Sequence, residues 1–317
     1  MSRLPLARTV VLFFSLSIIS SVAQAYTKNG FELDGASVPA REILSGGPPK
    51  DGIPAIDRPK FLAADRAGFL KEKDRVLGVA LEGAAKAYPI KILDWHEIVN
   101  DSIGAQHFAV TYCPLCGTGV AFAADVGGKR LNFGVSGLLY NSDVLLYDRN
   151  TESLWSQIMA EAITGEFKGT KLQPIPLRHT TWGDWLKEHP DSLVLSTDTG
   201  YRRNYNRSPY GDYAQSRRLY FSVSNRAPAI YHPKEQVMGV EVNGQFKAYP
   251  FVELSKQGNG MFAEQFAGQT FNVHWNEDAR SAYATDPDGN LLSTTIGFWF
   301  AWYTFYPETE VFKAPRN

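Results

Sequence analysis

The two cysteines of the chain, Cys113 and Cys116, lie three residues apart within residues 108–122. Two thiols at this spacing can close a short disulfide or direct both sulfurs at one metal ion. Alternating apolar residues lead into and out of the pair, and Pro114 and Gly117 interrupt them. This pattern predicts a strand, a tight turn and a second strand, with the cysteines at the bend of a hairpin.

Three kinds of chemistry remain open for the cysteine pair. A thioredoxin-like redox pair should open a helix, whose N-terminus lowers the pKa of the first cysteine, but glycines and β-type residues follow Cys116. The turn Cys-Pro-x-Cys-Gly is also typical of zinc ribbons and rubredoxin-like sites, although structural zinc normally needs four ligands and the chain has no second such pair. As a third alternative, a disulfide formed after export would staple the hairpin and contribute about 2 kcal/mol or less.

Polar residues just before the cysteine strand offer partners for the sulfurs. If the run Asp94–Asp101 forms a short helix, His96 and Asn100 share one face, and Glu97 and Asp101 share the adjacent face. His96 could complete a three-ligand site for copper or zinc with an open position, or act as a base toward a cysteine thiolate. Alternatively, His96 could buttress the hairpin through a hydrogen bond.

A second polar cluster spans residues 133–157. Asn141, Asp143 and Asp148 occupy turn-forming positions, where such residues usually serve the backbone, so they would join the chemistry only if they face the cysteines. Ser136 does not lie in a Gly-x-Ser-x-Gly elbow, which disfavours a serine hydrolase. The candidate catalytic residues are Cys113, Cys116, His96, Glu97 and Asp143, and the candidate metal ligands are Cys113, Cys116 and His96.

The segments that flank these residues contain an internal repeat. Residues 76–89 reappear in similar form as residues 237–250, and both copies predict a hairpin that turns at a Gly. Two further matches follow in the same order, one before the cysteines and one around paired tryptophans. We infer an internal duplication, in which the second copy lacks the cysteines.

The sequence therefore predicts a β-rich α+β protein with two related halves of short strands and few short helices. The better helix candidates are Ile92–Val99, Leu154–Glu161 and Thr181–Glu188. The expected division is a signal peptide (1–25), a Gly/Pro-rich N-terminal extension (26–75), a first half with the cysteines (76–196), a Tyr/Arg-rich connector (197–236) and a second half without cysteines (237–317).

The connector has too many aromatic residues for a disordered linker. Its simplest interpretation is an ordered segment laid over the surface. A sharper one is that Arg202, Arg203 and Arg207, with neighbouring tyrosines, line a groove for an anionic or sugar-like ligand.

The first residues indicate export. Arg3 and Arg8 precede the apolar run Val10–Ile19, which is too short to span a bilayer, and small residues offer a cleavage point after Ala25. Removing this segment takes away two arginines and no acidic residue, so the net charge changes from -1 to -3. This balance gives no electrostatic reason to expect binding to nucleic acid or an anionic membrane. We expect a periplasmic or secreted chain that does not insert into a membrane after signal cleavage.

Several motifs together resemble an exported bacterial family, the domain of unknown function 3179 family. They are Gly46–Pro54, Ala87–Pro89, His96–Asp101, Tyr112–Cys116, Ser136–Leu138 with Asn141–Asp143, and Ser153–Gln157. The resemblance covers nearly all of the chain after residue 25. It implies that the cysteine pair and the segments with His96 and Asp143 belong to one family pattern, but it implies no activity.

The leading hypothesis is an exported protein in which Cys113, Cys116 and His96 form a thiol-disulfide redox or metal centre, which leaves an oxidoreductase activity open. Its partner would be a small molecule or a periplasmic redox protein. One alternative is a copper or zinc binding or transfer protein that uses the same residues. Another is a carbohydrate or peptide binding module, in which the cysteines form a structural disulfide.

Overall fold

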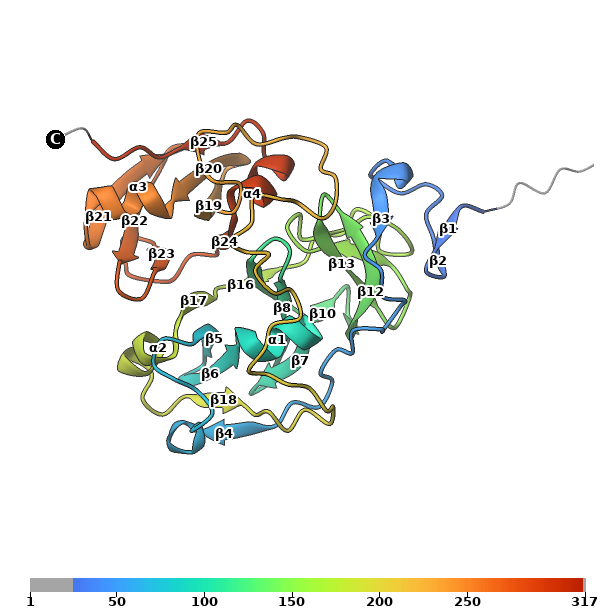
Figure 1. The fold of residues 1–317 in the computed structure, drawn as a ribbon, viewed down its shortest axis with the longest axis horizontal. Helices are drawn as coiled ribbons and strands as arrows, with labels where there is room; N and C mark the ends of the chain where they lie inside the picture. The colour runs from blue at the N-terminus through green and yellow to red at the C-terminus, as the bar shows by residue number, and fades with distance from the viewer. Residues whose placement is uncertain (1–24, 316–317) are drawn as a thin grey trace, which may run out of the picture.

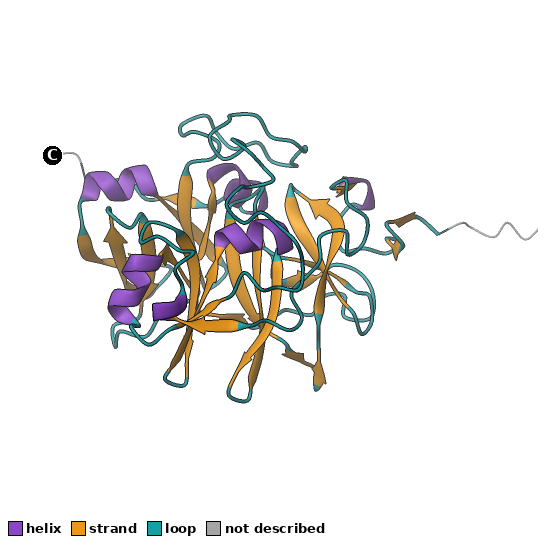
Figure 2. Cartoon of the chain, turned by 60° about the horizontal axis from the view of Figure 1, so that its bottom comes forward, coloured by secondary structure: helices purple, strands orange, loops and turns teal. Residues whose placement is uncertain are grey.

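A computed structural model describes residues 25–315 and confirms a β-rich protein. These residues form 25 strands and four α-helices, and Figure 2 shows the strands at the centre with helices and long loops around them. The predicted signal peptide lies outside the described residues, apart from Ala25.

The largest sheet has eight strands and includes segments from both parts of the chain. Its order is β25-β20-β19-β24-β9-β8-β7, with β16 beside β9. Its strands are β7 (Ile98–Ile103), β8 (Gln106–Cys113), β9 (Thr118–Ala123), β16 (Pro174–Ile175), β19 (Gln236–Val242), β20 (Gln245–Pro250), β24 (Thr295–Phe298) and β25 (Glu310–Val311). The pairing of Ile296 with Gly119 joins β24 to β9, so the cysteine hairpin is continuous with the C-terminal strands.

Two five-stranded sheets contain most of the remaining strands. One has the order β17-β5-β6-β18-β4: β4 (Phe61–Ala63), β5 (Arg75–Leu81), β6 (Ala84–Pro89), β17 (Arg178–Thr181) and β18 (Leu193–Leu195). The other has the order β15-β14-β13-β12-β3: β3 (Ile43–Ser45), β12 (Phe133–Tyr140), β13 (Asp143–Asp148), β14 (Leu154–Ser156) and β15 (Glu161–Ala162).

Smaller sheets complete the strand set. A three-stranded sheet contains β21 (Gly260–Phe266), β22 (Gln269–Asn276) and β23 (Ser281–Thr285). Two ribbons pair β1 (Thr27–Lys28) with β2 (Phe31–Glu32) and β10 (Asp125–Val126) with β11 (Lys129–Arg130).

The helices are short. The α-helices are α1 (Ile90–His96), α2 (Trp182–Glu188), α3 (Phe251–Gln257) and α4 (Trp299–Phe305), and 3-10 turns cover Ala40–Glu42 and Ala64–Arg66. Among residues 25–315, no helix has the length and apolar character needed to cross a membrane.

The helix predictions were correct at two of three places. Helix α2 agrees with the prediction, and α1 ends earlier than predicted because Glu97 adopts a left-handed conformation, with φ +57°. The predicted helix over Leu154–Glu161 is wrong. Residues Leu154–Ser156 form strand β14, which is buried on both faces and pairs with β13. A short, fully buried segment does not reveal its period, so its sequence alone cannot separate strand from helix.

The two predicted hairpins are confirmed and share one register. In β5-β6 the outermost pair is Val76 with Pro89, and in β19-β20 it is Val237 with Pro250. Both turns have two consecutive residues with positive φ, the conformation of a type I′ turn, which favours Asn-Gly. A seven-residue helix follows each hairpin directly.

Each hairpin also packs a glycine against a tryptophan. A Cβ atom at Gly78 would lie 2.4 Å from the ring of Trp185, and one at Gly239 would lie 2.1 Å from the ring of Trp302. The two glycines therefore allow α2 and α4 to approach the sheets closely.

We expect Gly239→Ala to lower the free energy of unfolding by about 1–3 kcal/mol, because the added methyl group overpacks the Trp302 contact. Urea unfolding followed by tryptophan fluorescence measures the change. Gly68→Ala is the control, since a Cβ atom there meets no atom within 4 Å. Equal stability of the two variants would contradict this packing.

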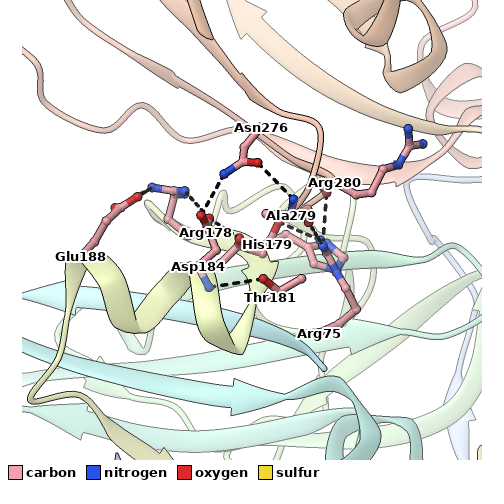
Figure 3. Close-up of polar contacts among 10 residues, drawn as sticks. Arg75, Arg178, His179, Thr181, Asp184, Glu188, Asn276, Ala279 and Arg280 are labelled. Atoms are coloured by element: carbon pink, nitrogen blue, oxygen red, sulfur yellow. Dashed lines mark hydrogen bonds and ion pairs between the residues drawn. The ribbon is translucent and has the colours of Figure 1, made fainter. Parts of the chain in front are cut away.

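Polar contacts join the first part of the chain to the turn between β22 and β23 (Figure 3). The side chain of Asn276 donates to Asp184 at 2.9 Å, and Arg75 donates to the backbone carbonyl of Ala279. Arg178 is almost fully buried and forms an ion pair with Glu188 at 2.8 Å. The C-terminal part is therefore fixed against the sheet that contains β5 and β17.

The connector between β18 and β19 contains no helix or strand. In Figure 1 it passes across α1 and rises to the C-terminal part. It is anchored by Lys234, which is buried and donates to the backbone carbonyls of Ser216 and Arg218. The connector is thus an ordered cover.

Candidate functional site

The cysteines lie where the sequence pattern predicts, at the bend between β8 and β9. These strands are antiparallel and their last pair is Cys113 with Thr118. The turn closes through a backbone hydrogen bond from Cys116 to Cys113 at 3.2 Å and needs Gly117 at φ +63°. Both thiols are free and buried, with relative exposures of 1% and 0%.

A second hairpin brings its own turn to the sulfurs. Strands β12 and β13 meet at Asn141-Ser142, two consecutive residues with positive φ, and the flanking pair is Tyr140 with Asp143. The Ser142 carbonyl accepts a hydrogen bond from the Cys116 thiol at 3.2 Å. The carboxylate of Asp143 therefore lies next to the cysteines.

Together, Cys113, Cys116 and Asp143 form a compact group. Their two sulfur atoms and one carboxylate oxygen all lie within 4.8 Å of one another. Three possible ligand atoms at this separation, two from one hairpin and one from another, could bind a single metal ion.

Asp143 has unused binding capacity. Its side chain is fully buried, and Oδ2 accepts a hydrogen bond from the backbone N–H of Ile158 at 3.0 Å. Apart from the neighbouring thiols, no donor among residues 25–315 reaches its Oδ1 atom. Burial raises the pKa of this carboxyl to about 8, although nearby backbone N–H groups oppose the shift.

The Cys116 thiol shares this electrostatic situation. Burial, together with the neighbouring Cys113 and Asp143, raises the pKa of Cys116 above its usual value. The group therefore resists becoming anionic unless a positive charge enters it. A reactive redox cysteine shows the opposite behaviour, namely a lowered pKa and access to solvent.

The connector covers the second hairpin turn and the cysteines. Ser224 donates its backbone N–H to Asn141 Oδ1 at 2.7 Å, and Ser142 donates its hydroxyl to the Phe221 carbonyl at 3.2 Å. Tyr213 belongs to the same core cluster as the cysteines, and its buried hydroxyl has no partner among the described residues. These contacts exclude water from the thiols.

The structure groups the cysteines with Asp143 and not with His96. His96 is fully buried at the end of α1, with Nδ1 2.8 Å from the Pro54 carbonyl and Nε2 2.8 Å from the Tyr205 hydroxyl. Both ring nitrogens are thus engaged, and burial lowers the pKa of the ring. His96 therefore links α1 to the N-terminal loop and the connector, whereas Asp143 is the residue whose carboxylate lies within 4.8 Å of the two sulfurs.

Glu97 lines a cavity of about 380 Å³ beside the cysteine turn. The cavity also contacts Leu115, which lies between the cysteines, and Val144, which follows Asp143. Burial raises the pKa of Glu97 to about 7, and the Tyr210 hydroxyl donates to this carboxylate at 2.9 Å.

Other polar residues of the 133–157 cluster serve the backbone. Asp148 accepts from Thr151 at 2.7 Å and from the Trp155 indole at 2.9 Å, which closes the turn before β14.

Sequence reasoning missed Tyr213 and also Asp94, which lines the same cavity as Glu97. Neither residue carries a motif, so no signal in the sequence separates it from other connector or helix residues.

Comparison with known proteins places the chain in a family. It matches no curated protein and no solved structure. A family model described as "Protein of unknown function (DUF3179)" matches residues 50–309, which include both hairpins of the cysteine group and the cavity lining except Gly46 and Pro48. The chain therefore belongs to the DUF3179 family, whose description states no function.

Proposed function

We propose that the protein binds one zinc ion through Cys113, Cys116 and Asp143. The observation that carries this proposal is the convergence of two thiols and the buried Asp143 carboxylate within 4.8 Å of one another, where Oδ1 has no donor among the described residues apart from these thiols. A cation would satisfy this oxygen and both sulfurs together.

The donor set favours zinc over copper. Zinc accepts thiolate sulfur and carboxylate oxygen together, with bond lengths of about 2.3 Å and about 2.0–2.2 Å. Cuprous copper prefers soft sulfur ligands, and the carboxylate of Asp143 is a hard one. Three protein ligands leave a fourth position for water, a substrate or another ligand, as in catalytic zinc sites.

The electrostatics also support a cation. Burial opposes the charged forms of both Asp143 and Cys116. A divalent ion would favour these anions and displace their protons, so zinc binding is expected to release protons and strengthen as the pH rises.

Zinc titration of the metal-free, reduced full-length chain tests the proposal. In competition with a chromophoric chelator, we expect one zinc ion per chain with about nanomolar affinity or tighter. Substitution by Co²⁺ should give a thiolate-to-metal absorption band. A chain that retains no stoichiometric metal and forms a disulfide resistant to mild reductant would overturn the proposal and favour a structural disulfide.

A thiol-disulfide centre is the second candidate function. It is favoured by the proximity of the two sulfurs to Asp143, whose carboxyl could exchange a proton with a thiol. The pair would lose two electrons and two protons to a disulfide-class oxidant. Equilibration of the metal-free chain in glutathione buffers separates the two candidates. Only in a redox centre should the cysteine pair be oxidised and reduced reversibly without metal, and Cys113→Ser should abolish this cycle.

We further propose that the chain is exported after cleavage at Ala25 and that its two halves arose by duplication. Support for duplication comes from the shared hairpin register and from the glycine–tryptophan contacts, Gly78 with Trp185 and Gly239 with Trp302. Mass spectrometry of the protein secreted from its cells would detect a mature N-terminus at Tyr26, whereas an uncleaved N-terminus would contradict export by this route.

A further inference from the structure

The cavity beside the cysteine turn is lined by two kinds of side chain. Its wall is mainly apolar and includes Ile53, Leu115, Val135, Leu139, Val144 and Phe221. Its polar groups include Asp94 and Glu97 from α1 and its end, and Arg203 and Tyr210 from the connector. A volume of about 380 Å³ lies within the range of small-molecule sites.

The carboxylate of Glu97 is positioned to contact a ligand. The residue is 6% exposed, and its Oε1 atom accepts the hydrogen bond from Tyr210. Among residues 25–315, no hydrogen bond reaches Oε2 of this carboxylate. Glu97 Oε2 is not among the fully buried unpartnered atoms of the described residues and Glu97 lines the cavity, so a donor that enters the cavity can reach this oxygen.

The charges of the cavity lining determine which kind of hydrogen-bond donor a ligand should carry. The Asp94 carboxylate shares the cavity with Glu97, and the proximity of these two acids raises the pKa of Glu97 further. The cation of the lining, Arg203, is on an exposed part of the connector and lies over the Trp95 ring at 5.7 Å. The buried or half-buried charged groups of the lining, Glu97 and Asp94, are therefore both acidic.

We propose that this cavity binds a small organic amine, whose ammonium group contacts Glu97 and Asp94 and whose apolar body fills the remaining space. Cys113, Cys116 and Asp143 are not among the residues that line the cavity, so different side chains form the ligand site and the proposed metal site. The inference goes beyond the proposed zinc site and does not depend on it.

Protonation provides a specific signature of amine binding. Near neutral pH the Glu97 carboxyl is partly protonated, because burial raises its pKa to about 7. Asp94, Tyr210, Tyr220 and Arg203 are the titratable or charged groups that share its cavity. An ammonium ion favours the carboxylate, so binding should release a proton and weaken as the pH falls below about 7.

Three indole compounds of matched size test the proposal: tryptamine, tryptophol and indole-3-acetate. Calorimetric titration of the full-length chain at pH 7.5 should show tryptamine binding at least about 10-fold more tightly than tryptophol, with indole-3-acetate weakest. The measured enthalpy should vary with the ionisation enthalpy of the buffer, which reports proton release. Absence of binding, or equal or tighter binding of indole-3-acetate, would overturn the proposal.

Variants separate recognition from folding. Glu97→Gln should lower tryptamine affinity at least about 10-fold and leave tryptophol affinity unchanged, which shows that the cavity is intact. Ile53→Trp should fill the cavity and abolish binding of both compounds, so retained tryptamine binding in this variant would contradict the assigned site. Cys116→Ser should bind tryptamine like the wild type. Tryptamine binding therefore tests the cavity and zinc binding tests the thiol group, so the two proposals can fail separately.

Discussion

Cys116→Ser should lower zinc affinity by more than about 100-fold. The substitution removes one of three ligand atoms that lie within 4.8 Å of one another. In characterised metal sites, loss of a residue that hydrogen-bonds to a metal ligand lowers metal affinity by about 10–100-fold. Loss of a ligand itself should lower the affinity more. Competition titration with a chromophoric chelator measures the change, and Asp143→Asn should fall between this variant and the wild type, because an amide oxygen keeps a neutral donor.

Ser142→Ala is the matched control for this series. The residue faces the thiols through its backbone carbonyl, while its hydroxyl points to the Phe221 carbonyl. Removing the hydroxyl therefore leaves the ligand atoms in place, and zinc affinity should change by less than about 3-fold. Wild-type affinity in Cys116→Ser would show that the metal binds elsewhere.

Glu97 should contribute a fall of about 3 kcal/mol to the free energy of unfolding as the pH rises from about 4.5 to about 7. Burial raises the pKa of this carboxyl from 4.5 to about 7. Between these values the unfolded chain has lost a proton that the native chain still holds, so the native state is favoured at the acidic end and loses the advantage as the pH rises. One pKa unit corresponds to about 1.4 kcal/mol.

Urea unfolding of the wild type and Glu97→Gln across this pH range measures the contribution. Gln keeps an oxygen for Tyr210 but does not titrate, so the free energy of unfolding of the wild type should fall relative to that of the variant by about 3 kcal/mol across this range. Glu32→Gln serves as the control, since Glu32 is exposed and its carboxylate makes no hydrogen bond or ion pair among residues 25–315. Parallel curves for the wild type and Glu97→Gln would contradict a buried, protonated Glu97.

Local chemistry explains which parts of the fold could be predicted. The hairpins at Gly83 and Gly244 follow from alternating strands around a two-residue turn, because such turns demand positive φ and glycine supplies it cheaply. The helix at Trp182–Glu188 begins at Thr181, whose side chain accepts from the Asp184 backbone N–H. These signals lie within a few residues of the structure that they specify.

Packing decided the elements that the sequence left ambiguous. Trp299–Phe305 forms α4, although its residues are mainly aromatic and most are buried. Leu154–Ser156 is equally buried but becomes a strand, because β13 offers it a hydrogen-bonding partner. Apolar content without a period reports burial alone, and the neighbouring elements then select helix or strand.

The sequence by itself determined the cysteine turn: two sulfurs at the bend of a β-hairpin, with Gly117 at the positive φ that the turn requires. The tertiary structure decided their partner. His96 is closer in sequence, but hydrogen bonds to Pro54 and Tyr205 engage both of its ring nitrogens. Asp143 reaches the sulfurs because β12 and β13 form a hairpin whose turn packs on the cysteine turn. Contacts between separate hairpins depend on how sheets pack, and no short-range signal in the sequence encodes that arrangement.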